Sequence, residues 1–118
     1  IQFPFCVSQV ARVVGIAALK DQAFIQKTVQ LNTEGLIHVR NGLDKLGLNH
    51  LPSTCNFITF DCGRNALELD KNLQKRGIIT RPLHPYGLEQ HLRVTIGTFE
   101  QNTRFLNALA ICLKETPA

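Results

Sequence analysis

Hydrophobic residues recur in the first part of the chain at the three- and four-residue spacing of a helix. Between positions 21 and 47 they form one stripe, which predicts a long helix with Asp21 as its N-cap and Gly47 as its stop. A Val- and Ala-rich stretch at 7–19, with Ser8 as a cap, predicts another helix before it. We therefore expect the first part of the chain to be helical.

The spacing changes after position 50, where strand-like and helical patterns alternate. Strands are predicted at 54–60, 78–80 and 91–96, the last with apolar and polar residues in strict alternation. Helices are predicted at 66–77 and 99–113, because each is preceded by a capping residue with Glu or Gln three positions later. The resulting order of elements is typical of an α+β domain. We expect a small, mainly antiparallel sheet of about three strands, with helices packed mainly on one face and a long helix preceding it.

Composition supports one globular domain. The chain has 118 residues, of which 44% are hydrophobic and 19% charged. No apolar run approaches the roughly 18 residues that cross a bilayer, so we expect no membrane partner. The chain begins at Ile1 and contains no Met. We interpret residues 1–118 as a single domain that is a piece of a larger protein.

Charge and cysteine content narrow the possible partners. The net charge is +4, but the basic residues are scattered, and the densest group, at 71–76, has the spacing of a solvated helix face. The chain also has only one Tyr, whereas a nucleic-acid-binding surface usually combines a continuous basic stripe with aromatic residues. We therefore expect no nucleic-acid partner. The four cysteines, Cys6, Cys55, Cys62 and Cys112, lack zinc-site spacing. They are interpreted as buried free thiols of a protein in the reducing cytoplasm.

Two arginines are the best candidates for binding chemistry. Arg81 and Arg93 bracket the segment 81–90, which is long for a hairpin connection. If the flanking strands pair antiparallel, both guanidinium groups can lie on one face and share an anion, since each fork binds phosphate or carboxylate. The alternative is that each pairs with a local acid, Asp61 or Glu89. The sequence has no phosphate-binding Gly-rich loop and no nucleophile-elbow motif.

Several segments, in order along the chain, resemble the histidinol-phosphate aminotransferases. The residues that carry the resemblance are Ile-Ile-Thr-Arg-Pro-Leu at 78–83, Tyr-Gly-Leu at 86–88 and His-Leu-Arg-Val-Thr-Ile-Gly-Thr-Phe-Glu-Gln-Asn at 91–102. Pro-Ser-Thr-Cys-Asn-Phe at 52–57 and Pro-Phe-Cys-Val at 4–7 resemble two further segments of that family, although an Asn is more usual where Cys6 stands. These enzymes are pyridoxal-phosphate-dependent aminotransferases of fold type I.

The resemblance implies that this chain is most of the small domain of such an enzyme, with residues 1–7 as an interdomain linker. The family converts histidinol phosphate and 2-oxoglutarate to imidazole acetol phosphate and glutamate in histidine biosynthesis. Its pyridoxal phosphate is held by a large domain, which supplies the Schiff-base lysine and the Asp at the pyridine nitrogen. We therefore expect the chain to be inactive alone, to have the large domain as its partner and to form a homodimer within the full enzyme.

The resemblance also implies roles for three residues. Arg93 matches the arginine that grips the anionic group of the substrate, which is the phosphate of histidinol phosphate or a carboxylate of glutamate. Arg81 matches a second phosphate-contacting arginine, and Asn56 matches a position near the substrate mouth. Two alternatives stay open: the small domain of another fold type I aminotransferase, for aromatic amino acids or threonine phosphate, and a stand-alone α+β module that binds an anionic metabolite.

Overall fold

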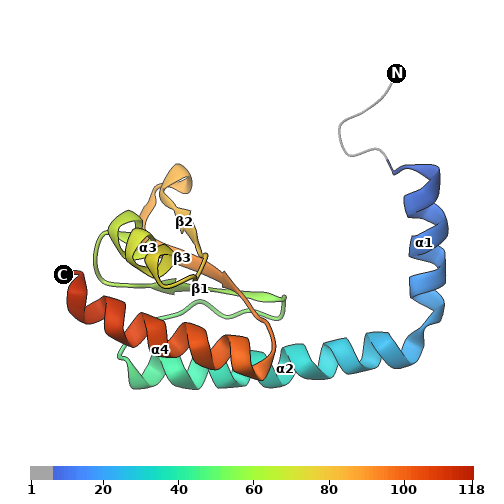
Figure 1. Ribbon diagram of the computed structural model, residues 1–118, viewed down its shortest axis with the longest axis horizontal. Coiled ribbons are helices and arrows are strands. Elements are labelled where there is room, and N and C mark those ends of the chain that lie inside the picture. The colour runs from blue at the N-terminus through green and yellow to red at the C-terminus, as the bar shows by residue number, and fades with distance from the viewer. Residues whose placement is uncertain (1–6) are drawn as a thin grey trace. The chain divides into compact units, whose positions relative to one another are not determined.

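The computed structural model describes residues 7–118 (Figure 1). The chain divides into two units, the first ending at Gln30 and the second being Leu31–Ala118. The expected linker at 1–7 lies outside the described residues except for Val7, and so does Cys6.

Two helices begin where the capping residues predict. Helix α1, Gln9–Lys20, starts after Ser8, whose Oγ accepts the N–H of Ala11 at 3.1 Å. Helix α2, Gln22–Lys45, starts after Asp21, whose Oδ1 accepts the N–H of Phe24 at 3.1 Å. The predicted long helix is thus confirmed. It ends two residues before Gly47, whose φ of 72° is the left-handed conformation that glycine favours after a helix.

The second unit contains a three-stranded antiparallel sheet of order β1-β3-β2, as predicted. Strand β1 is Phe57–Asp61, β2 is Arg81–Leu83 and β3 is Leu88–Thr95. The central strand, β3, pairs with both neighbours. The sheet therefore brings residues near 57–61 and 81–83 to the two sides of the same strand.

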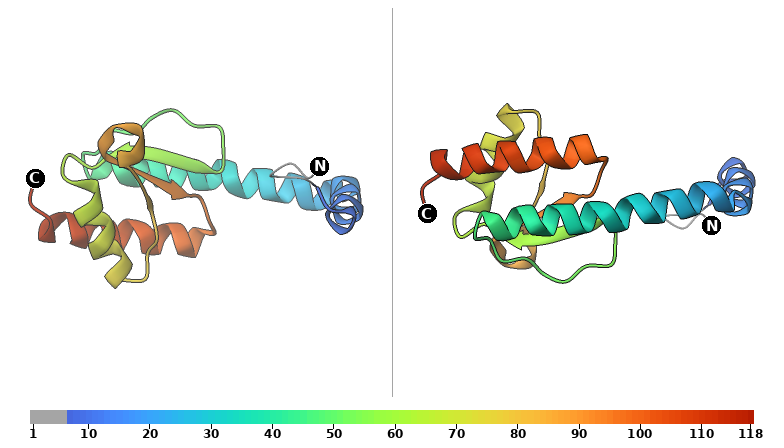
Figure 2. Two further views of the ribbon diagram at one scale, coloured as in Figure 1. Left: turned by 90° about the horizontal axis from the view of Figure 1, so that it is seen from above. Right: turned by 90° about the horizontal axis from the view of Figure 1, so that it is seen from below.

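Helices cover one face of this sheet. The second part of α2 and helix α4, Phe99–Glu115, run side by side on the same side of the strands (Figures 1 and 2). Helix α3, Ala66–Lys75, packs against α4, β2 and β3. Their apolar side chains meet the alternate residues of β1 and β3 that point toward them, and the largest fully buried residues of this core are Val39, Leu43, Ile58, Phe60, Leu69, Leu73, Leu92 and Leu109.

The caps predicted for the later helices are also present. Asn65 Oδ1 accepts the N–H of Glu68 at 3.2 Å at the start of α3. Thr98 and Gln101 form a reciprocal capping box at the start of α4, with hydrogen bonds of 2.9 and 3.2 Å. These bonds join residues three apart in sequence, which is why the sequence alone predicts them.

The prediction of a strand at 78–80 is wrong. Gly77 has a φ of 78°, and the N–H of Ile78 donates to the carbonyl of Leu73, so this segment still belongs to the end of α3. The β-branched residues that suggested a strand are used differently: Ile79 is 84% exposed, and Thr80 is buried against α3 through a side-chain hydrogen bond to Asp70. The strand β2 begins one residue later, at Arg81.

The expectation of a long loop at 81–90 is also wrong. Residues 81–83 form β2, a 3-10 turn follows at His84–Tyr86, and β3 begins at Leu88. Gly87, with a φ of 76°, closes the turn. The first strand is shorter than predicted, because residues 54–56 precede β1 as a loop.

The cysteine prediction holds for two of the three cysteines that the structure describes. Cys62 and Cys112 are buried free thiols, whereas Cys55 is free but exposed. Cys55 is exposed because it lies in the loop before β1 rather than in the strand. Burial raises the pKa of the Cys62 thiol, since a thiolate is poorly solvated in the core.

Candidate functional site

The face of the sheet that does not meet the helix core carries the candidate binding residues. Because side chains alternate along a strand, the odd-numbered residues of β1 and β3 lie on the face opposite to the buried Leu92 and Val94. We call this the outer face. Its residues are Phe57, Thr59 and Asp61 from β1, Arg81 from β2, and His91, Arg93 and Thr95 from β3.

Arg81 and Arg93 are directly opposite each other in the β2–β3 ladder. Directly paired residues of an antiparallel sheet project from the same face, so the two side chains are neighbours. Arg81 is exposed and Arg93 is partly buried. Like charges in this arrangement repel each other, and a bound anion relieves that repulsion.

Neither arginine forms an ion pair within residues 7–118. The two local acids that were the alternative partners do not pair with the arginines. Asp61 Oδ1 accepts the N–H of Gly63 at 2.8 Å, and Glu89 is exposed at the start of β3. The ion-pair interpretation of Arg81 and Arg93 is therefore not realised among residues 7–118. Both forks remain available for a phosphate or a carboxylate.

The side chain of Phe57 supports Arg93. The guanidinium carbon of Arg93 lies 4.7 Å from the centre of the Phe57 ring, which is the geometry of a cation–π contact. This contact holds the guanidinium group over the outer face without occupying its hydrogen-bond donors. Sequence analysis did not identify Phe57 as a site residue, because its place beside Arg93 depends on how β1 pairs with β3.

The hydrogen-bond pattern sets the spacing of the outer-face residues. The N–H of Ile96 donates to the carbonyl of Asn56, and the N–H of Cys62 donates to that of Gln90, both at 2.8 Å. Because hydrogen-bonded and non-hydrogen-bonded pairs alternate, Thr59 and Arg93 form a close non-hydrogen-bonded pair. Thr59, which is buried, Arg93 and Arg81 thus form one row across the three strands.

His91 lies on the same face, two residues before Arg93 and opposite Asp61. Its Nδ1 is buried and has no hydrogen-bond partner. An unpaired buried nitrogen is uncommon, because it loses its bond to water without gaining another.

Asn56 occupies a different position from the two arginines. It is exposed, one residue before β1, and its backbone carbonyl is the group that pairs with Ile96. Two side chains from α2 hold its loop: Asn32 donates to the carbonyl of Cys55 at 3.1 Å, and Arg40 donates to the carbonyl of Ser53. The structure therefore anchors this loop but does not bring the Asn56 side chain into the row of Arg81 and Arg93.

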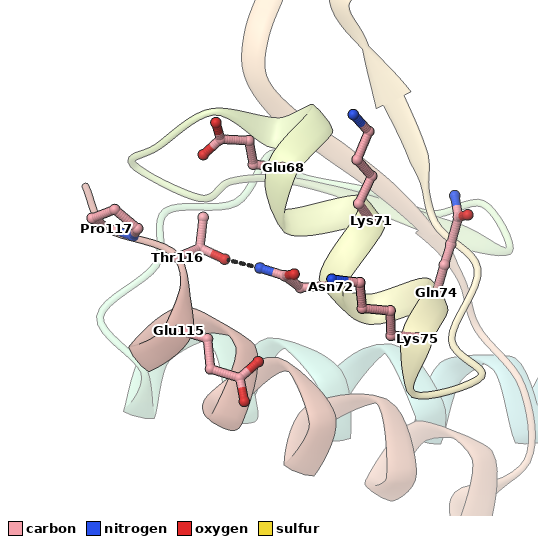
Figure 3. A pocket seen from close by; sticks show the side chains of 8 residues that line it. All are labelled: Glu68, Lys71, Asn72, Gln74, Lys75, Glu115, Thr116 and Pro117. Carbon is pink, nitrogen blue, oxygen red and sulfur yellow. Dashed lines mark hydrogen bonds between the residues drawn. The ribbon is translucent and has the colours of Figure 1, made fainter.

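A pocket of about 600 Å³ lies elsewhere, between α3 and the C-terminal residues (Figure 3). Both acidic and basic side chains line it: the glutamates are Glu68 and Glu115, and the lysines are Lys71 and Lys75. Asn72 points across it and donates to Thr116 Oγ1 at 2.6 Å, as Figure 3 shows. This mixed lining does not select a charged ligand, so the arginine pair remains the stronger candidate site.

Every lysine of the chain is exposed on a helix, whereas the arginine pair lies on the strands. A Schiff-base lysine is normally enclosed with its cofactor, and no lysine here has that environment. Within residues 7–118 no cluster of three or more potential metal ligands occurs, and none of the helices is long and apolar enough to span a membrane.

Comparison with known proteins identifies the family. The family model described as "Aminotransferase class I and II" matches residues 1–109. A protein of Legionella pneumophila (strain Philadelphia 1) named histidinol-phosphate aminotransferase 2 is 48% identical over 109 residues, covering 92% of this chain. A histidinol-phosphate aminotransferase of Symbiobacterium thermophilum is 44% identical over 112 residues, covering 95% of this chain.

Solved structures show the same fold. The histidinol-phosphate aminotransferase of Clostridium acetobutylicum superposes with a TM-score of 0.84 and 24% identity, over 97% of this chain and 36% of its own. That of Sinorhizobium meliloti, solved in complex with pyridoxal-5'-phosphate, gives a TM-score of 0.82 and 24% identity, over 98% of this chain and 32% of its own.

The match extends over most of this chain but only part of each relative. The chain spans 30% of the length of the Legionella protein and 31% of the Symbiobacterium protein. The matched region, residues 1–109, includes the whole sheet and both arginines of the outer face. This chain belongs to the family of class I and II aminotransferases.

Proposed function

We propose that this chain is the small domain of a histidinol-phosphate aminotransferase, and that Arg93 and Arg81 bind the anionic group of the substrate. The observation that carries the proposal is that the two arginines face each other across β2 and β3 with no acidic partner among residues 7–118. The 44–48% identity to proteins of that name supports the choice of substrate.

The chemistry of the reaction explains why a pair of arginines suits this position. An aminotransferase of this kind binds a phosphate ester in one half-reaction and a dicarboxylic acid in the other. Guanidinium forks donate two parallel hydrogen bonds to either group, so one site serves both substrates. Binding of the remote anionic group also fixes the amine group of the substrate in place. The binding energy therefore raises the rate of the reaction.

Asn56 is proposed as a residue near the substrate mouth, with its loop held by Asn32 and Arg40. Its amide can donate to one acceptor and accept from one donor of the substrate. Its side chain lies outside the row that contains Arg81 and Arg93, so it would contact a different part of the substrate from the anionic group.

The cofactor and the remaining partners are also part of the proposal. Pyridoxal phosphate, when bound in the rest of the enzyme, would accept the amino group from one substrate and return it to the other. The groups that hold it would belong to the rest of the enzyme. A large domain in the same polypeptide and a second subunit would complete the enzyme, in the cytoplasm.

The test uses a full-length enzyme containing this chain, loaded with pyridoxal phosphate. The visible absorbance of the cofactor is followed as histidinol phosphate and then glutamate are added. A response to both at low concentration is expected. A response to glutamate but not to histidinol phosphate would keep the aminotransferase and reject this substrate, and aromatic amino acids and threonine phosphate would then be tried.

A matched experiment on the 118-residue chain separates the proposal from a stand-alone binding module. The chain is mixed with pyridoxal phosphate and both substrates, and transamination is measured. No turnover is expected, because the lysines of the chain lie exposed on its helices. Turnover by the chain alone would contradict the assignment of the catalytic lysine to another domain.

A further inference from the structure

A buried aspartate lies directly behind the start of β2. Asp70, on α3, is 6% exposed, and its Oδ1 accepts the hydroxyl proton of Thr80 at 2.6 Å. Its second oxygen, Oδ2, accepts from the side-chain amide of Gln74 at 2.8 Å. Thr80 is itself 7% exposed and immediately precedes Arg81. The Asp70–Thr80 hydrogen bond is therefore a buried link between α3 and the strand that carries Arg81.

This link is not explained by stability alone. Asp70 forms no ion pair within residues 7–118, so its side chain is removed from water with only two hydrogen bonds in compensation. Burying a carboxyl group without a cation costs free energy, and an apolar residue of similar size would not incur that cost. A residue of this kind instead determines the geometry of the groups it bonds.

Strand β2 needs such a determinant, because its own pairing with β3 is weak. It has only three residues, Arg81–Leu83. The register also shifts between Pro82 and Leu83, so the ladder is regular only at Arg81 and Pro82. Before the strand, Ile79 is 84% exposed and provides little packing.

We infer that Asp70 is a positioning residue for Arg81, acting through the hydroxyl group of Thr80. The hydrogen bond holds the residue before Arg81 against α3, and thereby keeps Arg81 opposite Arg93 in the β2–β3 ladder. This inference rests on the proposed function, since it assigns Asp70 and Thr80 a role in the binding of the phosphate group by Arg81.

The test compares two substrates of a full-length enzyme containing this chain: histidinol phosphate, and histidinol, which lacks the phosphate. Thr80→Val removes the hydroxyl group and keeps the shape of the side chain. We expect kcat/KM for histidinol phosphate to fall about tenfold, since small displacements of a positioning group have effects of this order. We expect kcat/KM for histidinol to stay within about twofold of the wild-type value. Thr80→Ser, which keeps a hydroxyl group, should recover the kcat/KM for histidinol phosphate that Thr80→Val loses.

Gln74→Leu is the matched control. It removes the other hydrogen bond of Asp70 but leaves the Asp70–Thr80 bond in place. Gln74 is exposed, and its side chain leaves α3 in a different direction from that of Asn72, as Figure 3 shows. We expect kcat/KM of Gln74→Leu to be unchanged for both substrates.

Two results would overturn the inference. An equal loss with both substrates would show that Thr80 matters only for the general structure, and no loss with either would show that it does not position Arg81. If Thr80→Val folds poorly, Asp70→Ala/Thr80→Val removes both polar groups without leaving either unpaired, and the same comparison applies.

Arg81→Ala separates this inference from the proposed function. If Arg81→Ala lowers kcat/KM for histidinol phosphate alone and Thr80→Val does not, the arginine binds phosphate and only the positioning role of Asp70 fails. If Arg81→Ala itself has no selective effect, the proposed phosphate contact fails. If both roles hold, adding Thr80→Val to Arg81→Ala causes no further phosphate-selective loss, because the two residues act through one contact.

Discussion

The two faces of the small sheet have opposite character although they are built from the same strands. On the face toward the helices, Ile58, Phe60 and Leu92 are fully buried in the apolar core. On the outer face, Arg93 and Arg81 lie side by side without an acidic partner among residues 7–118. Under the proposed function, stability and binding fall to alternate residues of one strand, so that Leu92 and Arg93 are neighbours in sequence with separate roles.

The largest effect on stability is expected from the inner face. Leu92→Ala removes a fully buried side chain from the central strand, and the cavity should lower the free energy of unfolding by about 2–5 kcal/mol. Urea denaturation followed by circular dichroism measures this change. A loss below about 1 kcal/mol would mean that the inner face is not the main source of stability.

The largest effect on binding is expected from the outer face. Arg93→Ala should weaken the binding of the phosphorylated substrate by about 1.5–3 kcal/mol, roughly 10- to 100-fold, because charged hydrogen bonds are lost. Arg93→Lys should retain part of the affinity, since it keeps the charge and loses the fork. Substrate titration of the full-length enzyme measures both variants. Wild-type affinity in Arg93→Ala would exclude the proposed role.

The same Arg93→Ala variant should leave stability nearly unchanged. Its side chain is on the outer face, so the change in the free energy of unfolding is expected to stay within about 1 kcal/mol, most of it from the lost contact with Phe57. A destabilisation as large as that of Leu92→Ala would contradict the separation of the two faces.

A smaller effect on the free energy of unfolding is expected from the buried thiol of Cys62 at alkaline pH. Burial raises the pKa of this thiol in the folded state above its unfolded value of 9.0. The folded chain therefore retains a proton that the unfolded chain releases, and stability should fall as the pH rises above 9.0 toward the folded-state pKa. Cys62→Ala should reduce this loss between pH 8 and 10, relative to wild type, in urea denaturation.

Cys55→Ala is the control for that measurement, because the Cys55 thiol is exposed. It should leave the alkaline dependence as in wild type. If Cys62→Ala shows the same alkaline loss as wild type, other groups are responsible for it.

The smallest effect is expected from Thr95→Val, an exposed outer-face residue two positions after Arg93. Valine keeps the β-branched shape that strands favour, so stability should change by less than about 0.5 kcal/mol. Substrate affinity should be that of wild type. A loss of affinity would extend the binding surface along β3, beyond the arginine pair.

Local features were predictable because their hydrogen bonds join residues close in sequence. Ser8, Asn65 and Thr98 cap their helices as expected, each through a bond to the residue three positions later. The alternation from Leu92 to Ile96 likewise separated a buried face from the face of Arg93. The position of Gly47 also indicated where the long helix ends.

Predictions failed where a tertiary contact decided the structure of a short segment. The β-branched residues at 78–80 suggested a strand, but Thr80 is bound by Asp70 from α3, ten residues earlier. Residues 81–90 suggested a loop, because the pairing of Arg81 with Arg93 is invisible in local spacing. Strand propensity depends strongly on such pairing, which is why both errors concern β2.

The sequence by itself determined the order of helices and strands, the helix caps and the alternation that exposes Arg93, since each follows from neighbours along the chain. Only the tertiary structure decided the register of the sheet, and with it the juxtaposition of Arg81, Arg93 and Phe57. The physical reason is that register is set by the packing of a whole face against the helices. A shift of one residue would turn Arg93 into the core and Leu92 out of it.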